Sequence, residues 1–298
     1  MSVGVGMGAP TPQRVSLLTR LANPWAKTRF LWVIAVGYIT WTLIPVVEAV
    51  VFSFNKGRSI SQWQGFSLRW YTGDPDSSLL HSPALQHAIL QSLKLAAITA
   101  LVAVPLGVAF AISTHHWRGS SAGAANFIML FSFVTPELIL AVSLFLLVTH
   151  AFRFIGQGTE AQLIGLVVLA LAYPVVIVRA RLVSLGRSYE EAAMDLGASP
   201  VHTLGRVTVP LLAPSIFASA AIVFAIALDD FVVANQLSRD ASTQTASIYI
   251  YGAARTGPTP AANAIGTLML TASTLLILLV TLWVRRANRK RGDTRTPA

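Results

Sequence analysis

Four acidic residues lie inside long apolar stretches of the sequence, where a carboxylate is energetically costly. They are Glu48, Glu137 and the adjacent pair Asp229 and Asp230. A charged side chain at the centre of a bilayer costs about 2.5–3.5 kcal/mol on insertion scales, so such residues usually face a polar path or a partner. A path lined by carboxylates favours a di- or tricationic amine and repels anions. These residues are therefore candidate path residues for a small organic cation.

Each carboxylate also has a structural alternative. Neighbouring helical residues point about 100° apart, so we expect only one of Asp229 and Asp230 to face the path. The pair could instead cap a helix end or bind Arg239. Glu137, directly after a proline, could contact a partner subunit.

Aromatic side chains could add cation–π contacts to ammonium groups. The candidates are Trp41, Tyr173 and Tyr249, although Trp and Tyr also mark membrane interfaces and packing. Glu48 is the weakest of the acidic candidates, because a salt bridge to Lys94 would explain it equally well.

A polar loop over residues 188–214 carries a second pattern. Ser188 followed three residues later by Glu191 predicts a capping box at the start of a short helix. Gly197 suits the left-handed position that ends a helix. The small Ala192 and Ala193 permit close approach by another molecule.

A second short helix is predicted directly afterwards. Ser199 and Pro200 read as its N-cap and first residue. Pro210 and Pro214 bracket the return to an apolar stretch. The loop is thus expected to form a helix–turn–helix knob.

Composition indicates what positions these residues. Of 298 residues 54% are hydrophobic and 11% charged, the formal net charge is +10, and there is no cysteine. Soluble domains have about 25% charged residues. The basic excess among long apolar runs therefore indicates a membrane protein with basic loops rather than a nucleic-acid binder. Disulfides, thiolate zinc sites and a cysteine nucleophile are excluded.

Six apolar runs are long enough, or nearly so, to cross a bilayer, which takes about 20 residues. The fourth is short and contains Pro174. The predicted spans are 30–54, 95–114, 124–150, 163–178, 214–234 and 262–284.

The distribution of Lys and Arg predicts the orientation. Fifteen lie in the N-terminal segment, the second and fourth loops and the C-terminal tail, against six on the other side. The positive-inside rule then places both termini in the cytoplasm. We expect a basic, partly disordered N-terminus over 1–29, with an amphipathic helix as one reading of 14–29, a transmembrane domain over 30–284 and a basic tail over 285–298.

The knob resembles the EAA motif of the permease subunits of ABC importers. Glu191, Ala192 and Ala193 are followed at the motif's spacing by Gly197, and Val207-Thr208-Val209-Pro210 stands where the family has Ile-x-Leu-Pro. The resemblance implies the MetI-like fold, an all-α polytopic membrane protein with six transmembrane helices and a cytoplasmic coupling helix between the fourth and fifth. The coupling residues it implies are Glu190, Glu191, Ala192, Ala193, Asp195, Gly197, Ala198 and Pro210.

In that family the coupling helix docks on an ATPase subunit. The sequence has no Gly-x4-Gly-Lys-Ser/Thr loop, so the chain is expected to bind no cofactor itself. ATP and Mg would belong to two copies of a separate ABC ATPase. The resemblance further implies a second homologous permease, an external substrate-binding protein and a bacterial cytoplasmic membrane.

Further stretches resemble one branch, the second permease of spermidine/putrescine importers. They include 53–55, 63–66 and 70–71 in the first outer loop, 135–137, 228–231 and 248–249. A polyamine is the substrate that this branch implies. Phosphonate, ferric iron or opine importers of the same class, and a proton-coupled secondary transporter, are the alternatives. No catalytic constellation and no metal-binding spacing is found, so no enzyme or metal site is expected.

Overall fold

The computed structural model describes residues 28–117, 119–257 and 259–292 of the chain. Every regular element among them is a helix. The described part leaves out residues 1–13, which are expected to be disordered. It also leaves out most of the expected amphipathic segment 14–29 and the last six residues. The chain divides into two units, residues 1–48 and 49–298.

Helix α2 (Thr28–Phe52) forms the described part of the first unit and continues a few residues into the second. Its apolar stretch Leu31–Phe52 is long enough to cross a bilayer. Large apolar side chains are exposed on it, including Trp32 and Trp41. The first predicted span is therefore a helix, and Pro45 does not interrupt it.

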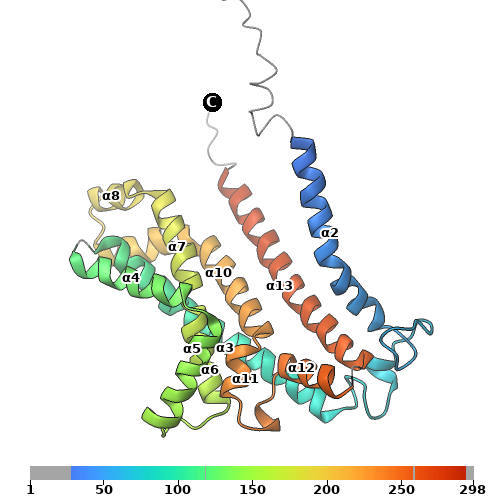
Figure 1. Cartoon of the computed structure of the whole chain (residues 1–298). Helices are drawn as coiled ribbons and strands as arrows, with labels where there is room; N and C mark the ends of the chain where they lie inside the picture. Colours follow the sequence, from blue (N-terminus) through green and yellow to red (C-terminus); the bar gives the residue numbers. More distant parts are fainter. Residues whose placement is uncertain (1–27, 118, 258, 293–298) are drawn as a thin grey trace, which may run out of the picture. The chain divides into compact units, whose positions relative to one another are not determined.

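The second unit is built around α3 (Pro83–His116), which packs against α10 (Val209–Asp229), α7 (Ala172–Leu185) and α6 (Thr159–Ala170). Helix α13 (Pro260–Gly292) packs on α10 and on α12 (Ala246–Thr256), and Figure 1 shows the arrangement. Within the part of the chain that the structure describes, five helices are long and apolar enough to span a membrane.

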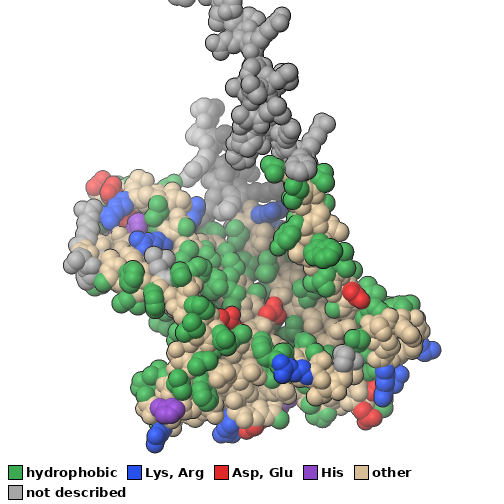
Figure 2. Space-filling view, in the orientation of Figure 1, with side chains coloured by type: hydrophobic (Ala, Val, Ile, Leu, Met, Phe, Trp, Pro, Cys, Tyr) green, Lys and Arg blue, Asp and Glu red, His purple; other side chains and the backbone are tan. Residues whose placement is uncertain are grey.

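Apolar side chains from these helices form the core of the second unit. One buried cluster joins α3, α6, α10 and α13 through Leu95, Leu166, Leu228 and Ile265. A Cβ at Gly107 would lie 2.5 Å from Cγ of Pro174, so only glycine permits this approach of α3 to α7. Charged and histidine side chains gather around α8 (Ser188–Asp195), whereas the neighbouring surface is largely hydrophobic (Figure 2).

The third predicted span, 124–150, is not one helix. Helix α4 (Ser120–Val134) ends before Thr135 and Pro136, and α5 (Glu137–Leu146) continues as a π turn, η3 (Leu147–Ala151). Both Thr135 and Pro136 are extended, with ψ of 127° and 131°. A residue before proline is driven out of the helical region. The third predicted span is therefore two helices separated by a break at Thr135 and Pro136.

Other helix ends also differ from the prediction. The fourth span is longer than 163–178, because α6 and α7 together run from Thr159 to Leu185. The fifth stops at Asp229, and a separate short helix, α11 (Val232–Leu237), follows. The sixth continues through the expected basic tail to Gly292. Among the described residues, five long apolar helices and a shorter one, Glu137–Ala151, are thus found where six spans of similar length were predicted.

A buried polar network holds α11 to the core. The side chain of Gln162 donates to the carbonyls of Ala234 and Thr243, at 2.9 Å each. Its own carbonyl accepts from Gln91 Nε2 at 3.1 Å, and Gln91 also donates to Thr159. Gln162 is fully buried. These bonds join α3, α6 and α11, which sequence patterns did not predict.

Replacing Gln162 by leucine is expected to destabilise the protein by about 2 kcal/mol, because buried partners left without a hydrogen bond each cost ~1–3 kcal/mol. The measurement is the apparent thermal unfolding midpoint of the purified protein in detergent, which should fall by several degrees. Asn235→Leu, at an exposed position of α11, is the matched control. Equal midpoints for Gln162→Leu and wild type would contradict the network's role.

Candidate coupling loop and acidic site

The loop after α7 forms the predicted knob. Helix α8 begins at Ser188, with Arg187 as its N-cap and no side-chain cap bond. The predicted capping box of Ser188 and Glu191 is therefore wrong, because Ser188 is already inside the helix. Its position and its length of eight residues match the prediction.

Gly197 ends this helix as predicted. Its φ is +86°, in the left-handed region that glycine adopts without strain. The N–H of Gly197 donates to the carbonyl of Met194, and that of Ala198 donates to Ala193. Together these bonds form a Schellman motif, which satisfies the last carbonyls of α8.

The second helix of the knob starts where the sequence predicted. Ser199 caps α9 (Pro200–Thr203) by accepting from the N–H of His202. The chain then continues through a π turn, η4 (Leu204–Thr208), directly into α10, so Pro210 does not end the helix. Pro210 is the second residue of α10, where a proline needs no N–H partner.

Glu190 points inward and joins α8 to two other elements. One carboxylate oxygen accepts from Nε2 of His116, at the end of α3, and the other from the hydroxyl of Thr208 in η4, both at 2.8 Å. Partial burial raises the pKa of Glu190, but the hydrogen bonds from His116 and Thr208 outweigh it and hold the pKa below its usual range. Glu190 is therefore an ionised internal link.

The outward surface of the knob is apolar at its tip and acidic beside it. Leu196 is 90% exposed and Val201 78%. Ala192 and Gly197 are exposed next to them, and so are the acidic side chains of Glu191 and Asp195. Such a compact exposed apolar tip is typical of a docking surface.

Two of the predicted path carboxylates come together. Asp230, buried in the break between α10 and α11, accepts from the N–H of Ala234 at 2.8 Å. Its carboxyl group also interacts with that of Glu137, the first residue of α5. Asp229 is exposed instead. The geometry agrees with one residue of the pair facing inward. Arg239 is not its partner, because it pairs with Asp240.

Comparison with known proteins identifies the family. The family described as binding-protein-dependent transport system inner membrane component matches residues 103–292. The chain belongs to this family of permeases. The family is the permease component of ABC transporters, not the catalytic one, and the chain is a multi-pass membrane protein.

Two curated relatives cover most of the permease. The putrescine transport system permease protein PotI of Escherichia coli strain K12 is 31% identical over 276 residues, which is 90% of this chain and 94% of PotI. The spermidine/putrescine transport system permease protein PotC of Haemophilus influenzae is 32% identical over 247 residues, with 82% and 92% covered.

Solved structures confirm the ABC-permease fold. A chain of a bacterial ABC transporter that imports the polysaccharide alginate aligns with a TM-score of 0.69 at 18% identity, covering 90% of this permease and 99% of that chain. A chain of the inward-facing MetNI methionine transporter aligns with a TM-score of 0.57 at 17% identity, covering 68% and 95%.

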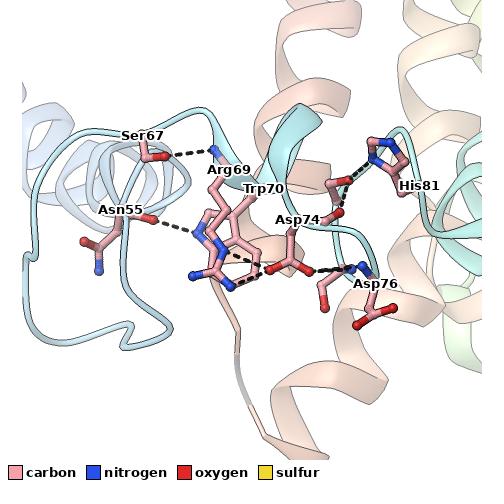
Figure 3. Close-up of polar contacts among 9 residues, drawn as sticks. Asn55, Ser67, Arg69, Trp70, Asp74, Asp76 and His81 are labelled. Carbon is pink, nitrogen blue, oxygen red and sulfur yellow. Dashed lines mark hydrogen bonds and ion pairs between the residues drawn. The ribbon is translucent and has the colours of Figure 1, made fainter.

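The loop after α2 of the permease is a folded element (Figure 3). The indole N–H of Trp70 donates to the carbonyl of Asn55 at 2.6 Å, and Arg69 binds Asp74 at 2.7 Å. Trp70 is buried against the start of α13. Burial raises the pKa of Asp74, but hydrogen bonds from Arg69 and two backbone N–H groups hold it below its usual range. Trp70 is thus a packing residue of this loop.

The aromatic candidates of the permease are scattered. Tyr173 stacks edge-to-face on Phe133, with ring centroids 5.4 Å apart. Tyr249 packs against the main core cluster. Trp41 is 75% exposed on α2, where Glu48 is exposed too. None of these contacts tests a role in the path, and the pairing of Glu48 with Lys94 stays a prediction.

Sequence analysis missed the inner partners of Glu190. No sequence pattern predicts His116 as a partner of Glu190, and Thr208 is only a position in the motif. Both lie far from Glu190 in sequence, by 74 and 18 residues. The one available signal was the position of His116 next to His115 at the end of a long apolar run.

Proposed function

We propose that this chain is a permease subunit of a polyamine importer, with spermidine or putrescine as its substrate. The observation that carries the proposal is the similarity, over most of the chain, to two permeases whose names specify putrescine and spermidine/putrescine. An external binding protein delivers the substrate. This chain and a second homologous permease form the path.

The acidic site suits that substrate. Glu137 and Asp230 bring two carboxyl groups together at the breaks of two apolar helices. A negative site of this kind lowers the energy of a polycation along the path. Glu48 and the aromatic residues Trp41, Tyr173 and Tyr249 are secondary candidates for the same path.

The knob is proposed to couple transport to a separate ATPase. Its exposed tip around Leu196 and Gly197 would dock in a groove of an ABC ATPase subunit, two copies of which hold ATP and Mg. Glu191 and Asp195 flank that tip. The coupling set of the family motif, from Glu190 to Ala198 with Pro210, thus lies in or directly after the knob. ATP shifts the equilibrium between the two states of the importer because it binds them with unequal affinity.

The orientation follows from the distribution of basic residues. Lys and Arg are concentrated in the segments that hold the knob and both termini. By the positive-inside rule these segments face the cytoplasm. The proposed location is the bacterial cytoplasmic membrane.

Uptake of labelled spermidine and putrescine tests the substrate. Deletion of the gene in its native cell is expected to lower uptake, and the wild-type gene should restore it. Uptake of an unrelated amino acid is the control. Unchanged polyamine uptake in a cell without a redundant carrier would contradict the polyamine assignment. Uptake that survives ATP depletion but is stopped by a protonophore would instead indicate a proton-coupled transporter.

A further inference from the structure

Polar contacts attach helix α8 to the rest of the second unit, and a cavity lies beneath the helix. None of its residues is buried. Between α8 and the bundle lies a cavity of about 230 Å³, lined by Ile112 and His116 of α3, Met194 of α8 and Thr203 and Leu204 beyond it. Close-packed interiors leave few voids larger than a water molecule. Packing alone therefore does not fix α8 to α3 and α10.

The side chain of Glu190 bridges this cavity. Only 15% of it is exposed, although α8 as a whole is not buried. Both ring nitrogens of His116 face oxygens, Nε2 that of Glu190 and Nδ1 the carbonyl of Ile112 at 2.9 Å. The imidazolium form donates to both acceptors. The link to α3 is thus a charge-assisted hydrogen bond, which is stronger than a neutral one.

The two elements that Glu190 contacts, the end of α3 and the π turn η4 before α10, both lead to the acidic site. Helix α10 runs from just after Thr208 to Asp229, about 32 Å at 1.5 Å per residue. Helix α3 leads from His116 back along the chain to Ser92. The hydroxyl of Ser92 accepts from the N–H of Ala246 at 2.9 Å, near the same helix break. Helices α3 and α10 thus both connect the contacts of Glu190 to the region of the acidic site.

We infer that Glu190, with His116 and Thr208, is the positioning joint through which movement of α8 is transmitted to α3 and α10. This inference rests on the proposed function, since it needs an ATPase that moves α8. Glu190 is assigned to the inner side of the knob and Glu191 to the outer, docking side. The two adjacent acidic residues thus have different tasks.

Alanine variants test the joint in the assembled importer, purified with its ATPase and reconstituted with the binding protein. Glu190→Ala and His116→Ala are each expected to lower uptake per ATP hydrolysed by roughly tenfold, as coupling energies of contacting pairs allow. The double variant should lose no more than either single one, because both remove the same contact. The ATPase should still co-purify, since the docking tip is unchanged.

A cross-link provides a measurement that would not change if Glu190 had only a structural role. Because the sequence has no cysteine, Glu190→Cys combined with His116→Cys creates the only thiol pair of this chain. A short bifunctional thiol reagent that joins the two positions should restore uptake per ATP. Each single cysteine variant, treated with the same reagent, is the matched control and should stay impaired.

The possible outcomes separate the two proposals. Quantitative cross-linking that leaves uptake lost while ATP is hydrolysed would show that α8 must move against α3, and would overturn the joint. Alanine variants as active as wild type would overturn it too. A wild-type chain that retains no ABC ATPase would overturn the proposed function itself, and the joint with it.

Discussion

Replacing Gly197 by proline is expected to abolish uptake while leaving the chain in the membrane. Gly197 has φ of +86°, and proline fixes φ near −65°, so the Schellman motif at the end of α8 cannot form. The substitution also removes the N–H that donates to Met194. A cost of about 3 kcal/mol, typical of a misplaced proline, is enough to lower uptake at least tenfold by misplacing the docking tip.

Two milder variants set the scale for this test. Gly197→Asn should retain most uptake, because asparagine adopts the left-handed region, whereas Gly197→Ala should be intermediate at a cost of roughly 1–2 kcal/mol. The measurements are polyamine uptake, the amount of protein in the membrane and retention of the ATPase. Normal uptake by Gly197→Pro would refute the assignment of this turn to coupling.

Removing both members of the carboxyl pair, with Asp230→Asn and Glu137→Gln together, is expected to lower spermidine uptake at least tenfold, or about 1.4 kcal/mol. Two neighbouring carboxylates repel each other, so such a pair favours one negative charge over two. The pair then presents one negative charge, and each single amide variant leaves that charge on the other residue. Only the double variant removes it.

Each single variant should therefore lose only a few-fold in uptake. The side chain introduced by Asp230→Asn can still accept from the N–H of Ala234, so this hydrogen bond to α11 is kept and the loss in the double variant reports charge rather than folding. Asp229→Asn, at the exposed neighbour, is the matched control for the charge of this region. Single and double variants with equal uptake would contradict a shared charge in the path.

Local backbone chemistry explains what the sequence predicted well. The left-handed turn at Gly197 and the cap formed by Ser199 before Pro200 depend on a few neighbouring residues, and both are found. The break at Pro136 obeys an equally local rule. Pro105, in contrast, lies within the continuous helix α3, so a proline inside an apolar run does not by itself predict a break.

Contacts between distant segments could not be predicted from one sequence. The bond from His116 to Glu190 spans 74 residues, and that from Gln91 to Gln162 spans 71. Neither pair has a spacing that local rules recognise, since the meeting of the residues depends on how the helices pack. Asp230 and Glu137 were each singled out by their apolar surroundings, but their contact with one another required the fold.

The helix break before Glu137 also has an electrical consequence. Helix α5 starts at the break, and a helix N-terminus carries the equivalent of roughly half a positive charge. Such an end attracts anions. Because Glu137 is the first residue of α5, its carboxylate opposes that field at its source. Together with Asp230, Glu137 therefore keeps the break attractive to cations in spite of the dipole of α5.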